Sequence, residues 1–248
     1  GQGLASRVNA KPPETRTDYR DYVRARPVPV ISHEIGQWCA YPNLAERSKY
    51  TGYLKAKNFD IFADTLAASG MADQAAAFLH ASGKLQSLLY KEDIESALRT
   101  PGMGGFQLLD LHDFPGQGTA LVGVLDPFWD SKGYVTAEAF QRFSGPTVPL
   151  ARLDRRVFTT AETLEADLEV AHFGPKPLAG ARPVWRLVGE DGRVVARGTL
   201  PVLDVPVDNG ITLGHVSVSL AKLVAPRKYR LVVGIEGSLI AARRPGGF

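Results

Sequence analysis

The stretch PVISHEIGQW, residues 29–38, joins a short apolar run to polar and aromatic side chains. Prolines before it end a short helix expected over residues 18–26, and the β-branched run VPVI, residues 28–31, predicts a strand. This strand ends abruptly in His33 and Glu34. Because a core strand needs neither an imidazole nor a carboxylate at its end, we interpret these side chains as candidates for a functional site.

A second segment of the same kind is GGFQLLDLHDF, residues 104–114, which predicts a strand with Asp110, His112 and Asp113 at its polar end. Residues 50–100, between the two strands, have helical apolar spacing. This order predicts a parallel βαβ unit, and the catalytic groups of (β/α) barrels lie at the C-terminal ends of their strands. Two strands cannot close an eight-stranded barrel, so we expect a partial TIM-barrel segment.

The sequence changes character after Pro149. Short segments with alternating apolar and polar residues follow one another, separated by turn sequences such as EDG and DNG. This pattern predicts an all-β sandwich of roughly 100 residues. We therefore predict an α+β multidomain protein, with the barrel segment over residues 1–147 and the sandwich over residues 148–248.

Composition excludes several classes of protein. The chain has 248 residues, of which 44% are hydrophobic and 22% charged, as expected for a globular protein with a substantial core. Its net charge of +3 comes from interspersed charges, so we expect no nucleic-acid partner. No run of 18 apolar residues occurs, so we expect no membrane span. The single Cys39 has no metal-ligand spacing around it and is expected to be a small buried residue, and we expect neither a metal nor a cofactor.

The order of these segments is similar to that of one enzyme family. PVISHEIGQW, a helical stretch, GGFQLLDLHDF and a β-sandwich together resemble the C-terminal part of glycoside hydrolase family 2, in particular its β-galactosidase-like bacterial members. The resemblance implies the last two strands of a TIM barrel followed by an immunoglobulin-like sandwich. It also implies that Glu34, in a P-x-[IV]-x-x-E pattern, is the nucleophile of a retaining β-glycosidase, first of all an exo-β-galactosidase. A glucuronide- or mannoside-hydrolysing relative would look similar in this half, and a periplasmic or secreted location is implied by the resemblance alone.

The chain departs from the family in ways that leave other functions open. The family's acid/base glutamate lies in an Asn-Glu pattern on the fourth strand, and no Asn-Glu dipeptide occurs here. The first six strands are also absent, so we expect a C-terminal fragment that carries the nucleophile. The alternative is a non-catalytic carbohydrate-binding or assembly module. A third hypothesis is that a second copy, or the remaining part of the barrel, pairs with the exposed sheet edges.

The proposed chemistry assigns roles to the residues around Glu34. Retaining glycosidases need two carboxyl groups about 5 to 5.5 Å apart, one ionised and one protonated. Glu34 would be the ionised one, and His33 and Gln37 could hold its carboxylate by hydrogen bonds. The alternative is a strand-end glutamate paired with an arginine of a neighbouring helix.

The remaining candidates would contact the sugar. Trp38 and Trp129 could stack on the C–H face of a pyranose ring, or could instead be packing residues between barrel and sandwich. Asp110 and His112 could bind sugar hydroxyls, as could His33. Alternatively, Asp110 caps the following turn and each histidine is a neutral side chain that bonds to the backbone; a His/Asp/His metal site is a weaker possibility.

Overall fold

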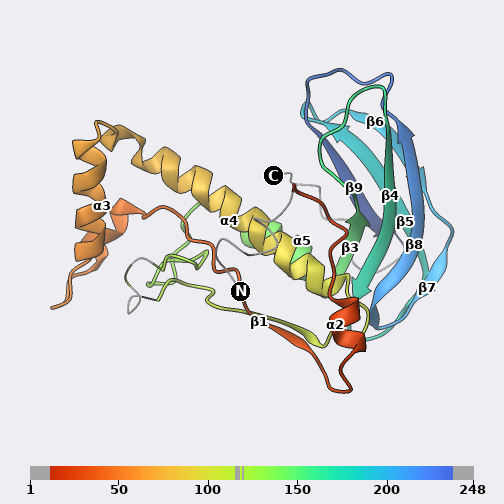
Figure 1. The fold of residues 1–248 in the computed structure, drawn as a ribbon, viewed down its shortest axis with the longest axis horizontal. Helices are drawn as coiled ribbons and strands as arrows, with labels where there is room; N and C mark the ends of the chain where they lie inside the picture. The colour runs from red at the N-terminus through yellow and green to blue at the C-terminus, as the bar shows by residue number, and fades with distance from the viewer. Residues whose placement is uncertain (1–11, 115–117, 119, 237–248) are drawn as a thin grey trace. The chain divides into compact units, whose positions relative to one another are not determined.

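The computed structural model describes residues 12–114, 118 and 120–236. Helices are the main regular elements of the first half of the chain, and antiparallel strands are those of the second half, as Figure 1 shows. The protein is therefore an α+β multidomain structure, as predicted. The elements are α2 (Arg20–Arg24), β1 (Ile31–Ile35), η1 (Leu44–Lys49), α3 (Lys57–Ala68), η2 (Ala72–Gln74), α4 (Ala75–Leu98), β2 (Gly105–Leu108), α5 (Ala137–Ser144), β3 (Thr147–Arg152), β4 (Thr163–His172), β5 (Leu178–Gly189), β6 (Val194–Thr199), β7 (Leu203–Val205), β8 (Asp208–Ser219) and β9 (Tyr229–Glu236).

The chain divides into two compact units. Among the described residues, the first unit comprises residues 32–94 and 106–141, and the second comprises residues 12–31, 95–105 and 142–236. The domain limits predicted from sequence, 1–147 and 148–248, stay a prediction. No helix in the described part of the chain is both long and apolar enough to cross a membrane.

Strands β1 and β2 pair in a two-stranded sheet. At one end Gly104 N donates to Val30 O at 2.8 Å, and at the other Leu109 N donates to Ile35 O at 3.0 Å. Because the partner numbers rise together, the strands run parallel, as the βαβ pattern predicts. The predicted strand limits were wrong by several residues, because β1 begins only at Ile31 and so contains Ser32, His33 and Glu34 rather than ending before them.

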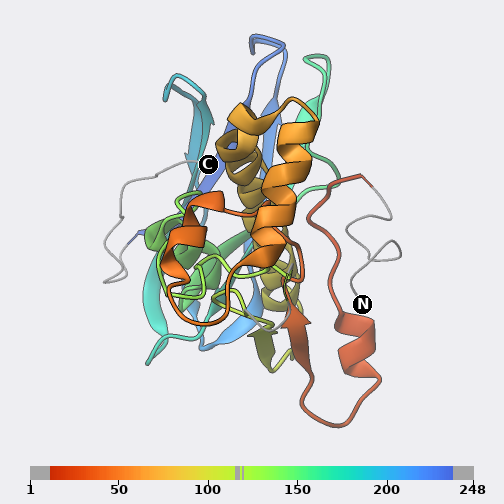
Figure 2. The same cartoon turned by 90° about the vertical axis from the view of Figure 1, so that its left-hand side faces the viewer.

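The helices of the first unit follow from the apolar spacing of the sequence. Helix α3 buries Phe59 and Leu66 and is followed by Gly70 at φ +71°, a backbone conformation that glycine adopts without strain. Helix α4 continues through Gly83, where a Cβ atom would lie 2.2 Å from the ring of Tyr134. Gly83 therefore permits close packing rather than breaking the helix. Figure 2 shows both helices in orange to olive, together with the green loop that follows β2.

The second unit contains two antiparallel sheets. One has the order β3-β4-β8; in the other, β5 pairs with β6, β7 and β9. The turn EDG closes a hairpin between β5 and β6, where Gly189 N donates to Arg193 O at 2.9 Å, as the sequence predicts. Strands β3 and β7 were not predicted from the sequence.

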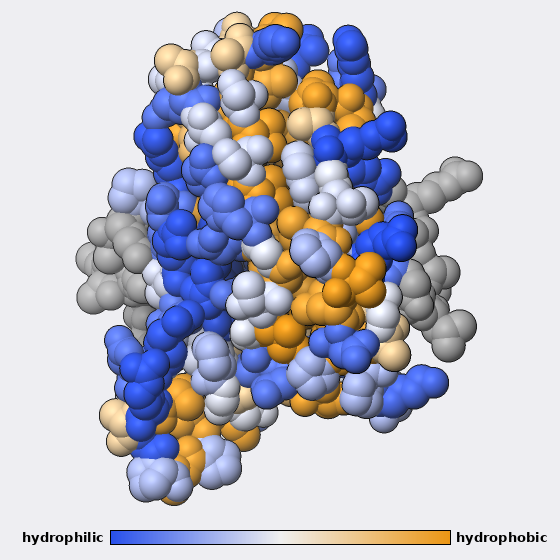
Figure 3. Space-filling view, turned by 90° about the vertical axis from the view of Figure 1, so that its right-hand side faces the viewer, coloured by the Kyte–Doolittle hydropathy of each residue, from blue (hydrophilic) through white to orange (hydrophobic). Residues whose placement is uncertain are grey.

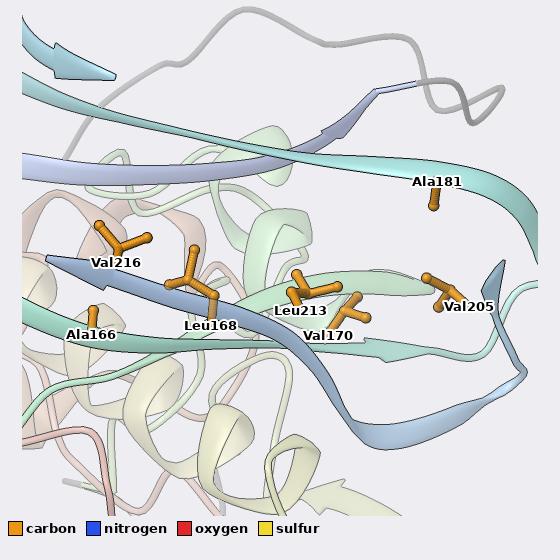
Figure 4. Packing of buried hydrophobic residues seen from close by; sticks show 7 residues of the cluster. All are labelled: Ala166, Leu168, Val170, Ala181, Val205, Leu213 and Val216. Atoms are coloured by element: carbon orange, nitrogen blue, oxygen red, sulfur yellow. The ribbon is translucent and has the colours of Figure 1, made fainter. Parts of the chain in front are cut away.

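The two sheets share one hydrophobic core. Its buried side chains come from both sheets, as Figure 4 shows, and those of β4 alternate along the strand: Ala166, Leu168 and Val170 of β4, Leu213 and Val216 of β8, Ala181 of β5 and Val205 of β7. Two sheets whose inner faces interdigitate in this way form a β-sandwich. Its outer surface is mixed: Val194, Val195 and Val224 are among its exposed hydrophobic residues. Figure 3 shows a face on which a hydrophobic band runs between hydrophilic borders.

Candidate functional site

Glu34 occupies an unusual backbone position in β1. Its φ angle is +51°, in the left-handed region that residues other than glycine rarely adopt. Gly36 follows at φ +83°, and a Cβ atom there would lie 1.8 Å from the ring of Tyr90, which is 1% exposed. Ile35 between them is buried. The chain is thus anchored directly after a residue with a strained backbone, and strained residues cluster at functional sites.

The carboxylate of Glu34 is accessible and held by two neighbours. Its side chain is 49% exposed. Gln37 Nε2 donates to Glu34 Oε2 at 3.3 Å, and His33 Nδ1 lies 3.8 Å from Glu34 Oε1. Within the described residues, Glu34 forms no ion pair with an arginine. An accessible carboxylate with a nearby amide donor can act as a nucleophile or as an acceptor for a hydroxyl group.

Two buried side chains of α4 hold the segments that follow β1 and β2. Tyr90 Oη donates to the carbonyls of Asp110 at 3.1 Å and Val122 at 2.8 Å. Gln86 Nε2 donates to the carbonyls of Trp38 at 2.5 Å and Leu121 at 3.0 Å. Neither residue was among the predicted site residues. The available signal was a glutamine and a tyrosine four residues apart in one helix, a spacing that places both side chains on the same face.

His112 and Trp129 form a pair of rings. Their centroids are 4.5 Å apart at an interplanar angle of 48°, and His112 Nδ1 lies 2.8 Å from the carbonyl oxygen of Asp113. Trp129 is 61% exposed and has a φ angle of +68°. A ring pair with such an exposed indole is a surface on which the C–H face of a sugar could stack.

Below these residues lies a buried charged cluster that sequence reasoning missed. Its buried members are Glu46 of η1 and Asp113, Asp126 and Lys132 of the segments after β2, and the partly exposed Lys49 of η1 lies at its edge. Lys132 Nζ lies 2.6 Å from Asp113 Oδ2, with both side chains 2% exposed, and also donates to Gly123 O at 2.7 Å. Lys49 forms an ion pair with Asp126. Asp113 therefore has a structural partner rather than an open carboxylate.

Glu46 differs from the other charged residues of this cluster. It is 1% exposed, and within the described residues neither of its carboxylate oxygens has a hydrogen-bond partner. Burial, followed by the nearby carboxylate of Asp126, raises the pKa of Glu46 to about 7. A carboxyl group in this state is protonated in mildly acidic solution.

The structure brings some candidates together and leaves others apart. Glu34, His33 and Gln37 form one group, and His112 and Trp129 form another. Within the described residues, no hydrogen bond, ion pair or ring contact joins the two groups to each other. Trp38 is half-buried, and its Nε1 has no hydrogen-bond partner in that part of the chain. Asp110 is half-buried, and among the described residues its carboxylate makes no hydrogen bond or ion pair.

Other features of the described residues bear on the chemistry. No group of three or more His, Cys, Asp and Glu side chains among residues 12–114, 118 and 120–236 is arranged to hold a metal ion. Cys39 is exposed, so its predicted burial was wrong: it follows Trp38 in a loop outside the core. Two cavities, of about 600 and 250 Å³, lie in the second unit, and neither borders Glu34.

Comparison with known sequences identifies only part of the chain. A family model described as a domain of unknown function, DUF8488, matches residues 162–243, a range that includes strands β4 to β9. A comparison with curated proteins finds no match.

Solved structures give a wider match at the level of the fold. The crystal structure of a β-D-mannosidase from Dictyoglomus thermophilum is similar with a TM-score of 0.53 and 11% identity, covering 89% of this chain and 27% of that chain. The exo-chitosanase CsxA from Amycolatopsis orientalis is similar with a TM-score of 0.39 and 14% identity, covering 71% of this chain and 20% of that chain. This chain therefore spans less than a third of the length of either enzyme.

Proposed function

We propose that this chain is the part of a retaining β-glycosidase that carries the nucleophile, Glu34. The observation that carries the proposal is the state of that side chain. It is accessible, it extends from a residue with a left-handed backbone, and an amide donor contacts its carboxylate. A nucleophile must be ionised and reachable by the anomeric carbon, and the buried residues directly after Glu34 help to keep the direction of its side chain.

The proposed architecture is the last two strand–helix units of a (β/α)8 barrel followed by an immunoglobulin-like sandwich. The fold similarity to the β-D-mannosidase supports this assignment. The strand pairing of the sandwich also supports it. The orders β3-β4-β8 and β6-β5-β9 correspond to the A-B-E and C′-C-F pairings of immunoglobulin domains.

The substrate would be a carbohydrate. His33, Gln37, Trp38, Asp110, His112 and Trp129 are the residues proposed to contact it. Hydrolysis with a poor leaving group also needs a general acid. We propose that this acid, and the strands that pair with the open edges of β1 and β2, come from the remaining part of the barrel or from a second copy. The exposure of Val28 and Ile31, at 61% and 58%, supports a covering partner for this sheet. No nucleic-acid or membrane partner is proposed.

Two sugars should be tested first. The resemblance of the motif around Glu34 favours a β-galactoside, and the name of the structural neighbour favours a β-mannoside. The two sugars differ in the configuration of their 2- and 4-hydroxyl groups, so a single probe would not decide between them.

The test is covalent trapping of the nucleophile in the longest natural polypeptide that contains residues 1–248. The protein is incubated with 2-deoxy-2-fluoro β-galactosyl and β-mannosyl fluorides, and its mass is measured before and after digestion. We expect one glycosyl adduct on the peptide that contains Glu34, and none in Glu34→Gln. An adduct on another carboxylate would refute the assignment of the nucleophile.

A carbohydrate-binding module without catalysis is the second candidate. The absence of an Asn-Glu dipeptide from the chain favours it. Binding of either sugar by calorimetry, without an adduct and without hydrolysis of activated aryl glycosides, would select this function over the first.

A further inference from the structure

Asp126 closes the loop that carries Trp129. Its Oδ1 accepts hydrogen bonds from the backbone N–H groups of Phe128 at 2.9 Å and Asp130 at 3.0 Å. Its backbone carbonyl accepts from Trp129 N at 3.0 Å, and its N–H donates to Asp130 O at 2.9 Å. Residues 126–130 thus form one turn around a single aspartate, as expected for an aspartate that precedes a proline.

This turn holds Trp129 in a conformation that it would not adopt alone. The left-handed backbone, at φ +68°, costs a non-glycine residue free energy that the surrounding bonds must offset. In this conformation the indole ring lies 4.5 Å from the imidazole of His112, centroid to centroid, and stays 61% exposed. The hydrogen bonds to Asp126 therefore determine where an exposed aromatic side chain is presented.

Lys49 fixes Asp126 from the side of η1. The carboxylate of Asp126 is 2% exposed, and its Oδ2 forms an ion pair with Lys49 Nζ. The same ammonium lies 2.7 Å from Asp130 Oδ2 and 5.6 Å from the ring centroid of Phe128. Tyr50, the next residue, packs edge-on against Phe128 at 5.0 Å between ring centroids. The end of η1 therefore contacts three members of the turn.

We infer that Asp126, supported by Lys49, is a positioning residue that presents Trp129 as a stacking surface for the pyranose ring of the substrate. This inference rests on the proposed function, because it takes the ligand to be a carbohydrate. Asp126 itself is buried, and among the described residues its carboxylate forms its hydrogen bonds and ion pair with the turn and Lys49, so it acts through Trp129. An indole that stacks on the sugar ring contacts the bound substrate and the transition state about equally. Loss of this stacking therefore weakens binding more than it slows the chemical step.

Three variants separate the contributions of Asp126. Asp126→Ala removes both the acceptor of the turn and the partner of Lys49. Asp126→Asn keeps a side-chain oxygen that can accept from the two N–H groups but removes the charge. Asp60→Asn is the matched control, since Asp60 also pairs with lysine and arginine side chains but lies on the exposed surface of α3.

The first readout is the separation of KM from kcat for an aryl β-glycoside, in the natural polypeptide used for the trapping experiment. We expect Asp126→Ala to raise KM about tenfold while kcat changes by less than about threefold. Asp126→Asn should recover most of the wild-type KM, and Asp60→Asn should leave both constants unchanged. Wild-type KM in Asp126→Ala would overturn the inference.

The second readout reports on Trp129 without any substrate. The emission of wild type minus that of Trp129→Phe isolates this indole among the three tryptophans of the chain. We expect acrylamide to quench it more strongly in Asp126→Ala than in wild type, with recovery in Asp126→Asn. An unchanged Trp129 signal with intact hydrolysis would refute the positioning role alone. A changed signal in a protein that binds neither sugar would refute the carbohydrate ligand, and with it the proposed function.

Discussion

Replacement of Glu46 by glutamine should leave the stability of the first unit unchanged below pH 4.5 and raise it increasingly up to about pH 7 and above. Glu46 is buried on η1 with no hydrogen-bond partner for its carboxylate among the described residues, and its pKa is raised to about 7. A glutamine amide has the same shape as the protonated acid and cannot ionise. The two proteins should therefore differ only at pH values at which Glu46 ionises in the unfolded chain.

The magnitude follows from the pKa shift. The pKa rises from 4.5 in the unfolded chain to about 7 in the folded protein. Each unit is worth about 1.36 kcal/mol, so a rise of about 2.5 units gives about 3.4 kcal/mol. Because the folded pKa is the higher one, this contribution is fully present below pH 4.5 and is lost as the pH rises through 7. Wild type should lose this stability over that range, and Glu46→Gln should not.

The assay is urea unfolding at a series of pH values from 5 to 9 in a Trp185→Phe background. This background leaves Trp38 and Trp129, both in the first unit, as the fluorescent reporters. Asp64→Asn, an exposed position on α3, is the control for the loss of a charge. Unfolding free energies of wild type and Glu46→Gln that stay parallel from pH 5 to pH 9 would refute the reasoning, since they would place the charge of Glu46 in contact with solvent.

Further predictions concern single contacts. Gly123→Ala should destabilise the first unit by more than about 2 kcal/mol, because a Cβ atom at residue 123 would lie 2.3 Å from the carbonyl carbon of His112. Thermal unfolding of the two proteins measures this loss of stability. Leu168→Ala, in the core of the sandwich, should cost about 2 to 5 kcal/mol, and Leu168→Met less than half of that, by denaturant unfolding. The hydrogen bonds of His215 to Asp167 and Glu165 raise its pKa, so NMR should show it titrating above its ordinary pKa of 6.5. Its protonated form should therefore stabilise the fold below pH 6.5, and this stabilisation should be lost as the pH rises through the pKa of His215 in the folded protein. A His215 titration that Asp167→Asn leaves unaltered would contradict this assignment.

Much of the fold is predictable from local sequence. Period-two alternation and the turn residues identify five of the sandwich strands, because half-buried strands and tight turns need those residues. Helix α5 begins after Thr136, whose Oγ1 accepts from Ala139 N at 3.2 Å, as expected for a helix cap. Asp126 is the Asx-turn residue that its place before a proline predicts.

The limits of β1 could not be predicted in the same way. The apolar run ends at Ile31, but the strand continues to Ile35 because backbone bonds to β2 continue to that residue. Strand pairing depends on a partner about 70 residues away and is invisible in a local pattern. The left-handed backbone at Glu34 and Trp129 could not be foreseen either, since nothing in a non-glycine side chain indicates it.

The buried charges around Glu46 were missed for a different reason. Charged residues are ordinarily exposed, so sequence alone gives no ground for placing Glu46, Asp113 and Lys132 in an interior. Only the three-dimensional arrangement shows that Lys132 compensates Asp113, while Glu46 has no such partner in the described part of the chain. The roles proposed for His33, Glu34 and the other site residues stay predictions until the trapping experiment is done.

The burial of Lys132 also gives this protein an internal covalent reporter. Its amine is enclosed between Asp113 and the carbonyl of Gly123, whereas the side chain of Lys57 is 79% exposed. An acylating reagent can reach Lys57 at all times, but will reach Lys132 only when the surrounding segments separate. The ratio of the two modified peptides over time therefore reports how readily this part of the protein opens. It can be followed by mass spectrometry in any buffer without free amines, with or without a sugar.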